Sequence, residues 1–149
     1  MDTPAPTLDP ASAAHHAAPR TSPRRLVSAL WLFAILCYLY CDVLGFYYAP
    51  HLGELLDGRA GSIEVTQGFL LGSAVLMTIP IGMTLVSRIA PWPVARWATV
   101  AAGSVMTIAQ TASLLVGSGL TLHYAYFSVL EIATTAFLAG YAAFRWRVQ

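Results

Sequence analysis

Four long apolar segments constrain the fold of this chain more than any other feature of its sequence. Each holds about 20 residues, which at a rise of 1.5 Å per residue matches the ~30 Å hydrocarbon core of a bilayer. The segments are Leu26–Tyr48, Val65–Ser87, Trp97–Val116 and His123–Phe144. The alternating pattern of a barrel wall is absent from the sequence, and an open sheet edge is not tolerated in lipid. The sequence therefore predicts an all-α transmembrane bundle of four helices.

The composition is that of a chain that lies in a membrane rather than in water. Hydrophobic residues make up 57% of the 149 residues and charged residues 10%, against roughly 45–50% and about 25% in soluble domains. The formal net charge is +1, so the chain has no general electrostatic attraction to nucleic acid. We expect an integral membrane protein whose main partner is the lipid bilayer.

Residues 1–25 precede the first apolar segment and differ from the rest of the chain. They combine prolines and alanines with no hydrophobic periodicity, so folding them would bury too little apolar surface to offset the lost conformational entropy. We predict a disordered tail, followed by one transmembrane domain over residues 26–149. Two adjacent histidines in a tail bind metal weakly, so His15 and His16 are not expected to form a metal site.

The arginines predict the orientation of the bundle. Basic residues near helix ends are retained on the cytoplasmic side, and short connections make successive helices antiparallel. The basic residues on one side of a four-helix topology are Arg20, Arg24, Arg25, Arg88, Arg96, Arg145 and Arg147. We therefore predict a multi-pass protein of the cell inner (plasma) membrane with both termini cytoplasmic. The loop Ala49–Glu64, which contains Arg59, would face outward.

The second apolar segment carries small residues and a proline. Gly68 and Gly72, with Ser73 beside them, form a face that allows another helix to approach closely. Pro80 has no N–H group and is expected to kink this helix, which frees the carbonyl oxygen of Leu76. We predict that the small-residue face packs against a neighbouring helix.

Two carboxyl groups lie within the apolar segments, Asp42 in the first and Glu131 in the fourth. A carboxyl group at this depth costs several kcal/mol unless it is paired, hydrated or protonated. Counted along the helices, both residues and Gln110 fall at similar height in the outer half. We expect these side chains to point into the bundle, near Gln67 and Tyr38, and to form a polar pocket that opens outward.

This predicted pocket has two interpretations. It binds a ligand or a proton, or it is a structural hydrogen-bond network in which a protonated Glu131 donates to Gln110. Hydrogen bonds within membranes contribute only about 0.6 kcal/mol on average, so two acids are costly if they only fix the helix register. We favour a binding site.

The remaining polar residues indicate no cofactor, metal or catalytic set. Cys37 and Cys41 lie four residues apart in one helix, so their Cβ vectors are parallel and unsuited to a disulfide. His51 falls in a loop and His123 at a helix end, so neither is placed to hold haem within a span. The sequence also lacks phosphate-binding loops and the common hydrolase motifs.

Three stretches of the sequence, LWLFAILCYLYCDVLGF, GFLLGSAVLMTIPIGMTLVSR and YFSVLEIATT, resemble recurring blocks of a small bacterial family of four-span membrane proteins. That family is known only as a domain of unknown function. The resemblance covers about residues 26–146. It implies a fold and a membrane location, and it adds no chemistry.

Three classes of function fit these features. The first is a small-solute or proton-coupled transporter, or a binding protein of that type, working as an oligomer. Asp42 and Glu131 would carry the coupling, and Gln110, Gln67 and Tyr38 would orient the ligand. The second is an accessory subunit of a membrane complex, whose second helix meets a partner protein. The third is a membrane enzyme that acts on a lipid or isoprenoid with the two acids as acid and base. We favour the first class over an enzyme.

Overall fold

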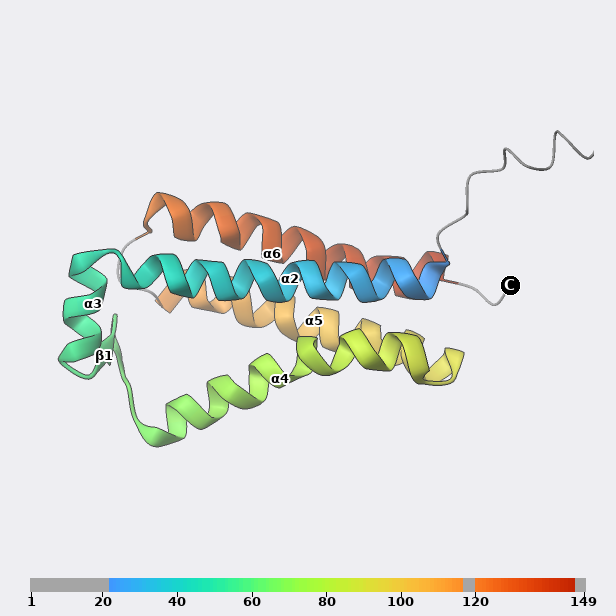
Figure 1. Cartoon of the computed structure of the whole chain (residues 1–149), viewed down its shortest axis with the longest axis horizontal. Helices are drawn as coiled ribbons and strands as arrows, with labels where there is room; N and C mark the ends of the chain where they lie inside the picture. Colours follow the sequence, from blue (N-terminus) through green and yellow to red (C-terminus); the bar gives the residue numbers. More distant parts are fainter. Residues whose placement is uncertain (1–21, 117–119, 147–149) are drawn as a thin grey trace, which may run out of the picture.

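The computed structural model describes residues 22–116 and 120–146; the predicted tail up to residue 21, the connection 117–119 and residues 147–149 lie outside the described residues. Within these ranges four long helices form a bundle (Figure 1). They are α2 (Pro23–Phe46), α4 (Gln67–Ile89), α5 (Trp92–Val116) and α6 (Leu122–Gly140). A π-helical turn, η1 (Tyr141–Arg145), continues α6. The predicted four-helix bundle is confirmed.

The four long helices have the length and the surface of membrane spans. In the described part of the chain, four helices are long and apolar enough to cross a membrane: Pro23–Phe46, Gln67–Ile89, Trp92–Leu115 and Leu122–Arg145. Large apolar side chains such as Leu85 and Ile108 are more than half exposed (61% and 68%), whereas the polar Thr99 and Thr135 are fully buried. This distribution suits lipid outside and polar contacts inside. The chain is a multi-pass membrane protein.

The start of α2 differs from the prediction by three residues. Ser22 caps the helix, and its hydroxyl accepts a hydrogen bond from the Arg25 backbone N–H at 3.4 Å. Pro23 follows in the first turn, where its missing N–H costs nothing. Residues 23–25 therefore belong to α2 and not to the predicted tail.

The connection between α4 and α5 is also shorter than predicted. α5 begins at Trp92, five residues before the predicted start, because Pro93 lies in its first turn, where proline is tolerated. The Ala95 N–H closes this turn on the Pro91 carbonyl oxygen at 2.9 Å. Only Ala90 and Pro91 separate the two helices, which makes them antiparallel neighbours.

The predicted outer loop Ala49–Glu64 contains regular structure. It holds the short helix α3 (Ala49–Leu56) and an antiparallel hairpin of β1 (Arg59–Ala60) and β2 (Ile63–Glu64). Gly61, at the hairpin turn, has a φ of 63°, a left-handed conformation that glycine adopts without strain. We call this end of the bundle the α3 end (Figure 1).

The opposite end, which we call the arginine end, is where the described chain begins and ends. Five of the six described arginines lie there: Arg24, Arg25, Arg88, Arg96 and Arg145. Arg24 donates to the carbonyl oxygens of Arg88 (3.0 Å) and Ala90 (2.7 Å), at the last turn of α4. A cation at this position satisfies carbonyl groups that have no partner within the helix.

Arg96 forms a second tie at the arginine end. Its guanidinium donates to the carbonyl oxygens of Ala142 (2.8 Å) and Ala143 (2.6 Å) in η1. It also lies 5.3 Å from the ring centroid of Trp92 and 5.4 Å from that of Trp97, within the range of cation–π contacts. The start of α5 is thereby fixed to the end of α6.

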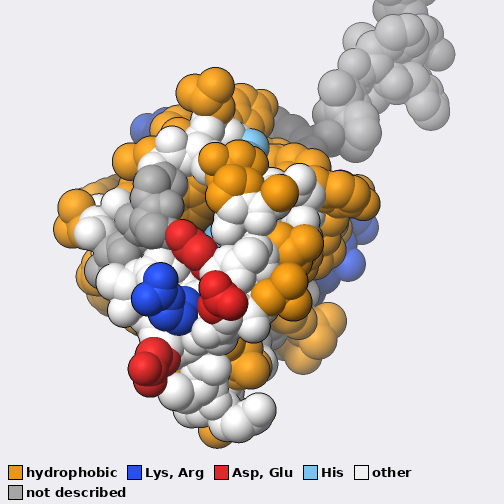
Figure 2. Space-filling view, turned by 90° about the vertical axis from the view of Figure 1, so that its left-hand side faces the viewer, with side chains coloured by type: hydrophobic (Ala, Val, Ile, Leu, Met, Phe, Trp, Pro, Cys, Tyr) orange, Lys and Arg blue, Asp and Glu red, His pale blue; other side chains and the backbone are white. Residues whose placement is uncertain are grey.

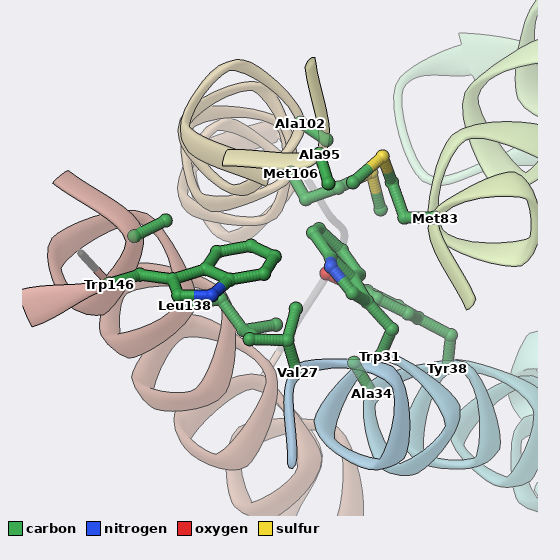
Figure 3. Close-up of a cluster of buried hydrophobic side chains, with 11 residues drawn as sticks. Val27, Trp31, Ala34, Tyr38, Met83, Ala95, Ala102, Met106, Leu138 and Trp146 are labelled. Atoms are coloured by element: carbon green, nitrogen blue, oxygen red, sulfur yellow. The ribbon is translucent and has the colours of Figure 1, made fainter. Parts of the chain in front are cut away.

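The hydrophobic core lies toward the arginine end (Figure 3). Trp31 of α2 is completely buried among side chains from all four long helices and from the segment after η1. The buried cluster comprises Val27, Trp31, Ala34, Tyr38, Met83, Ala95, Ala102, Met106, Leu138, Ala142 and Trp146. None of its members comes from α3 or the hairpin, so the core holds the helices together at one end only.

A glycine of α5 marks a close contact between helices. A Cβ atom added to Gly103 would lie 2.8 Å from the Thr135 carbonyl oxygen and 3.1 Å from the Ala139 Cβ. A Cβ added to Gly72 of α4 would meet nothing within 4 Å, and one added to Gly68 only Thr66 at 3.8 Å. Among the described residues, therefore, Gly68 and Gly72 lie against no neighbouring helix.

Candidate functional site

A cavity of about 210 Å³ lies among the four long helices, next to the core on the side of the α3 end. Its lining comes from α2, α4, α5 and α6: Tyr38, Cys41, Asp42, Leu76, Met77, Met106, Ala109, Gln110, Ser113, Tyr124 and Glu131. Tyr38 and Met106 belong to both the core and this lining. The structure thus brings together four of the five residues that we predicted for the pocket.

Glu131 is the most buried polar group of this cavity. It lies in the middle of α6, its side chain is 1% exposed, and neither carboxyl oxygen has a hydrogen-bond partner among the described residues. An ionised carboxylate in such surroundings would cost several kcal/mol. The neutral acid is therefore the form that these surroundings favour.

The neighbours of Glu131 hydrogen-bond along the α5–α6 contact instead. Gln110 donates its side-chain N–H to the Ser128 hydroxyl at 2.9 Å. The hydroxyl oxygens of Thr107 and Thr135 lie 2.8 Å apart, and those of Ser113 and Tyr124 lie 2.7 Å apart. These three bonds fix the register of the two helices. They do not include Glu131, contrary to the structural network in which Glu131 donates to Gln110.

Asp42 occupies a different environment from Glu131. It lies three residues before Gly45 on α2, it is exposed in the isolated chain, and its side chain borders the cavity. His51 of α3 packs over the helical turn of α2 that contains Asp42 and Gly45. A Cβ atom added to Gly45 would lie 3.4 Å from the His51 ring. Asp42 thus stands between the buried Glu131 and the surface of the α3 end.

The part of α4 that lines the cavity lies one helical turn before its proline, Pro80. Leu76 and Met77 line the cavity, and Pro80 is fully buried one turn further on. Pro80 cannot donate to the Leu76 carbonyl oxygen, and α4 bends near its middle (Figure 1). The first half of α4 diverges from α2 beyond this bend.

A second cavity of about 630 Å³ lies at the α3 end. It is lined by Cys41, Asp42, Gly45, Tyr48, Pro50, His51, Glu54, Leu55, Ala60, Gly61, Ile63, Phe69, Ser73, Ser113, Leu120, Thr121, His123 and Tyr124. Figure 2 looks onto this end, where acidic side chains lie beside a basic one, with hydrophobic side chains around them. The two cavities adjoin, because Cys41, Asp42, Ser113 and Tyr124 line both.

One predicted site residue, Gln67, lies elsewhere. Gln67 is the exposed first residue of α4 and lines neither cavity. Cys37 and Cys41 are both free thiols, and Cys41 lines both cavities. Among the described residues, no group of three or more His, Cys, Asp or Glu side chains is arranged to hold a metal ion.

Sequence reasoning missed several lining residues. Ser113 of α5 and Tyr124 of α6 join the site through their mutual hydrogen bond. The helical spacing of Met106, Gln110 and Ser113 was the available signal, since residues three and four apart share a face.

The bundle and its cavities define a class: an integral membrane protein of four spanning helices with a carboxyl-bearing site between them. Comparison with known protein families narrows this class to one family. The chain belongs to a family of unknown function (DUF6326), whose sequence model matches residues 19–149. No curated protein and no solved structure matches the chain.

Proposed function

We propose that this protein is a proton-coupled transporter or binding protein for a small solute, and that its site is the cavity between Asp42 and Glu131. The observation that carries the proposal is the Glu131 carboxyl group, which is 1% exposed and has no hydrogen-bond partner among the described residues. A group with only a structural role would have its oxygen atoms satisfied. An unpaired acid beside a second carboxyl group is suited to hold a proton and release it when a ligand binds.

Infrared difference spectra of the full chain across a pH titration test this proposal. The band of a protonated carboxyl group is expected at neutral pH and is expected to disappear in Glu131→Gln. Glu64→Gln changes an exposed acid of the hairpin and serves as the matched control, which should keep the band. Absence of the band at neutral pH, or its survival in Glu131→Gln, would contradict the proposal.

The proposal includes an orientation, with the arginine end in the cytoplasm and the α3 end outside a plasma membrane. It is supported by the five arginines gathered at one end, where the described chain also begins and ends. Single cysteines at Arg145 and Asp57, in a background without Cys37 and Cys41, test it in intact cells. An impermeant thiol reagent is expected to label the cysteine at position 57 and not that at 145; the reverse pattern would refute this orientation.

The second candidate function is an accessory subunit, or one copy in a homo-oligomer. It is favoured by the small-residue face of α4, where Gly68 and Gly72 leave room that no helix of the same chain occupies. Gly72→Leu is then expected to break an association between chains without unfolding the monomer. Size measurements in mild detergent on the wild type and this variant test it, and an identical size for both would count against a contact at Gly72.

A further inference from the structure

The charge of the larger cavity selects the kind of ligand that it can hold. Asp42 and Glu54 line it, and no described arginine does; the chain contains no lysine. Glu54 also accepts a hydrogen bond from the Gly61 N–H at 3.3 Å, which places its carboxyl group at the hairpin. Walls that carry two carboxyl groups and no arginine or lysine attract a positively charged ligand and repel an anion, with His51 and His123 as the other ionisable side chains of the lining.

The remaining walls select for apolar groups and aromatic contacts. Tyr48, Phe69 and Tyr124 contribute rings from three different helices or their ends, and cations bind favourably over such rings. Leu55 and Ile63 add aliphatic surface. The volume of about 630 Å³ is within the range of about 300–1,000 Å³ of pockets that enclose drug-sized molecules.

We propose that the larger cavity binds an organic cation that carries apolar rings or chains, with its charge beside Asp42. The inference rests on the proposed function and names its substrate class. Because Asp42 lines both cavities, a cation seated beside it borders the inner cavity, which Glu131 also lines. Its positive charge replaces the proton held by the pair of acids, so one proton leaves for each cation that binds.

Several other ionisable groups face the two acids and belong in this charge balance. His51 and Glu54 of α3, and His123 and Tyr124 of α6, line the larger cavity together with Asp42. Tyr38 and Cys41 of α2 lie with Glu131 at the inner cavity. The walls from α4 and α5 are neutral, because α4 contributes Leu76 and Met77, and α5 contributes Met106, Ala109, Gln110 and Ser113.

The test compares tetraphenylphosphonium with tetraphenylborate, two ions of the same shape and opposite charge. Equilibrium dialysis with the full chain in detergent is expected to show saturable binding of the cation only. Asp42→Asn is expected to lower the affinity for the cation by about tenfold or more. Asp57→Asn, an exposed acid of the same end that does not line the cavity, is the matched control and should change the affinity little.

The outcomes separate this inference from the proposed function. Equal binding of both ions, or binding of neither, overturns the inference, and the comparison needs no variant to fold. A protonated Glu131 band without cation binding leaves the proposed function in place and refutes the substrate class. Cation binding that depends on Asp42 but releases no proton, measured with a pH dye in weak buffer, supports the cation site and refutes the coupling.

Discussion

The two ends of this bundle are made from the same four apolar helices and are packed differently. Toward the arginine end, Val27, Trp31 and Leu138 are completely buried, and Arg24 and Arg96 tie helix ends together. Toward the α3 end, the same helices border two cavities, and α4 diverges from α2 (Figure 1). Hydropathy places a helix in the membrane, but it does not decide how closely the helix packs. The core and the arginine ties lie toward one end, and the two cavities lie toward the other.

The largest expected effect tests this contrast with one aromatic residue from each end. Trp31→Ala removes a completely buried side chain and is expected to lower the free energy of unfolding by about 3–5 kcal/mol. Phe69→Ala removes a side chain that is 37% exposed beside the larger cavity, with an expected loss of about 1 kcal/mol or less. Denaturant unfolding in mixed micelles measures both values. Equal losses would mean that the α3 end is packed as tightly as the core.

The next effect concerns the α5–α6 contact. Gly103→Leu would place a side chain where the first added carbon already lies 2.8 Å from the Thr135 carbonyl oxygen. We expect a loss of about 3 kcal/mol, since overpacking forces the backbones apart. Gly72→Leu, with nothing within 4 Å of its added Cβ, is the control and should leave monomer stability unchanged. A smaller loss for Gly103→Leu than for Gly72→Leu would reverse our assignment of the close helix contact.

A third effect tests the ties at the arginine end. Arg96→Gln removes a charge that donates to two backbone carbonyl groups, so thermal unfolding in detergent should show a loss of about 1.5–3 kcal/mol. Arg25→Gln removes an exposed charge from the same end and is expected to cost about 0.5 kcal/mol or less. If both variants lost equally little, the arginines would serve the orientation of the chain and not its packing.

The smallest effect at neutral pH is expected for Glu131→Gln, because glutamine resembles the neutral acid in shape. Its stability should lie within about 0.5 kcal/mol of the wild type at pH 7. As the pH rises, the wild-type carboxyl group loses its proton and becomes a buried charge with no described partner, so the wild type loses stability. Glutamine cannot ionise, and the stability of the variant should fall less steeply. Chemical unfolding at neutral and alkaline pH measures this difference; parallel slopes would contradict it.

The sequence predicted those features that follow from the geometry of single helices. The heights of Asp42, Gln110 and Glu131 could be counted at 1.5 Å per residue, and the structure places all three around one cavity. Tyr38 joins them because it lies one helical turn before Asp42 on the same face of α2. These relations need no knowledge of how the helices cross.

Features that depend on the packing between helices could not be predicted. The Gly68–Gly72 pattern shows where close approach is permitted, but the neighbouring surface decides where it happens, and within the chain this is at Gly103. Gln67 was expected at the site, yet the divergence of α4 leaves it exposed at the helix start. The larger cavity combines residues of α3 and the hairpin with residues of all four long helices, and its walls meet only in the folded chain.

The proline of α4 allows the first half of this helix to pivot relative to the second half. On one side of Pro80, α4 is held by the Ser28 hydroxyl on the Thr84 carbonyl oxygen (2.9 Å) and by Arg24 on its last turn. On the other side, Leu76, Met77 and Ile79 are only partly buried against the core, and residues 67–72 are exposed. The segment from Gln67 to Pro80 is about 20 Å long, so a pivot of about 20° moves its tip by about 7 Å. Phe69 and Ser73 of this half of α4 line the larger cavity, so a pivot at Pro80 changes the width of that cavity.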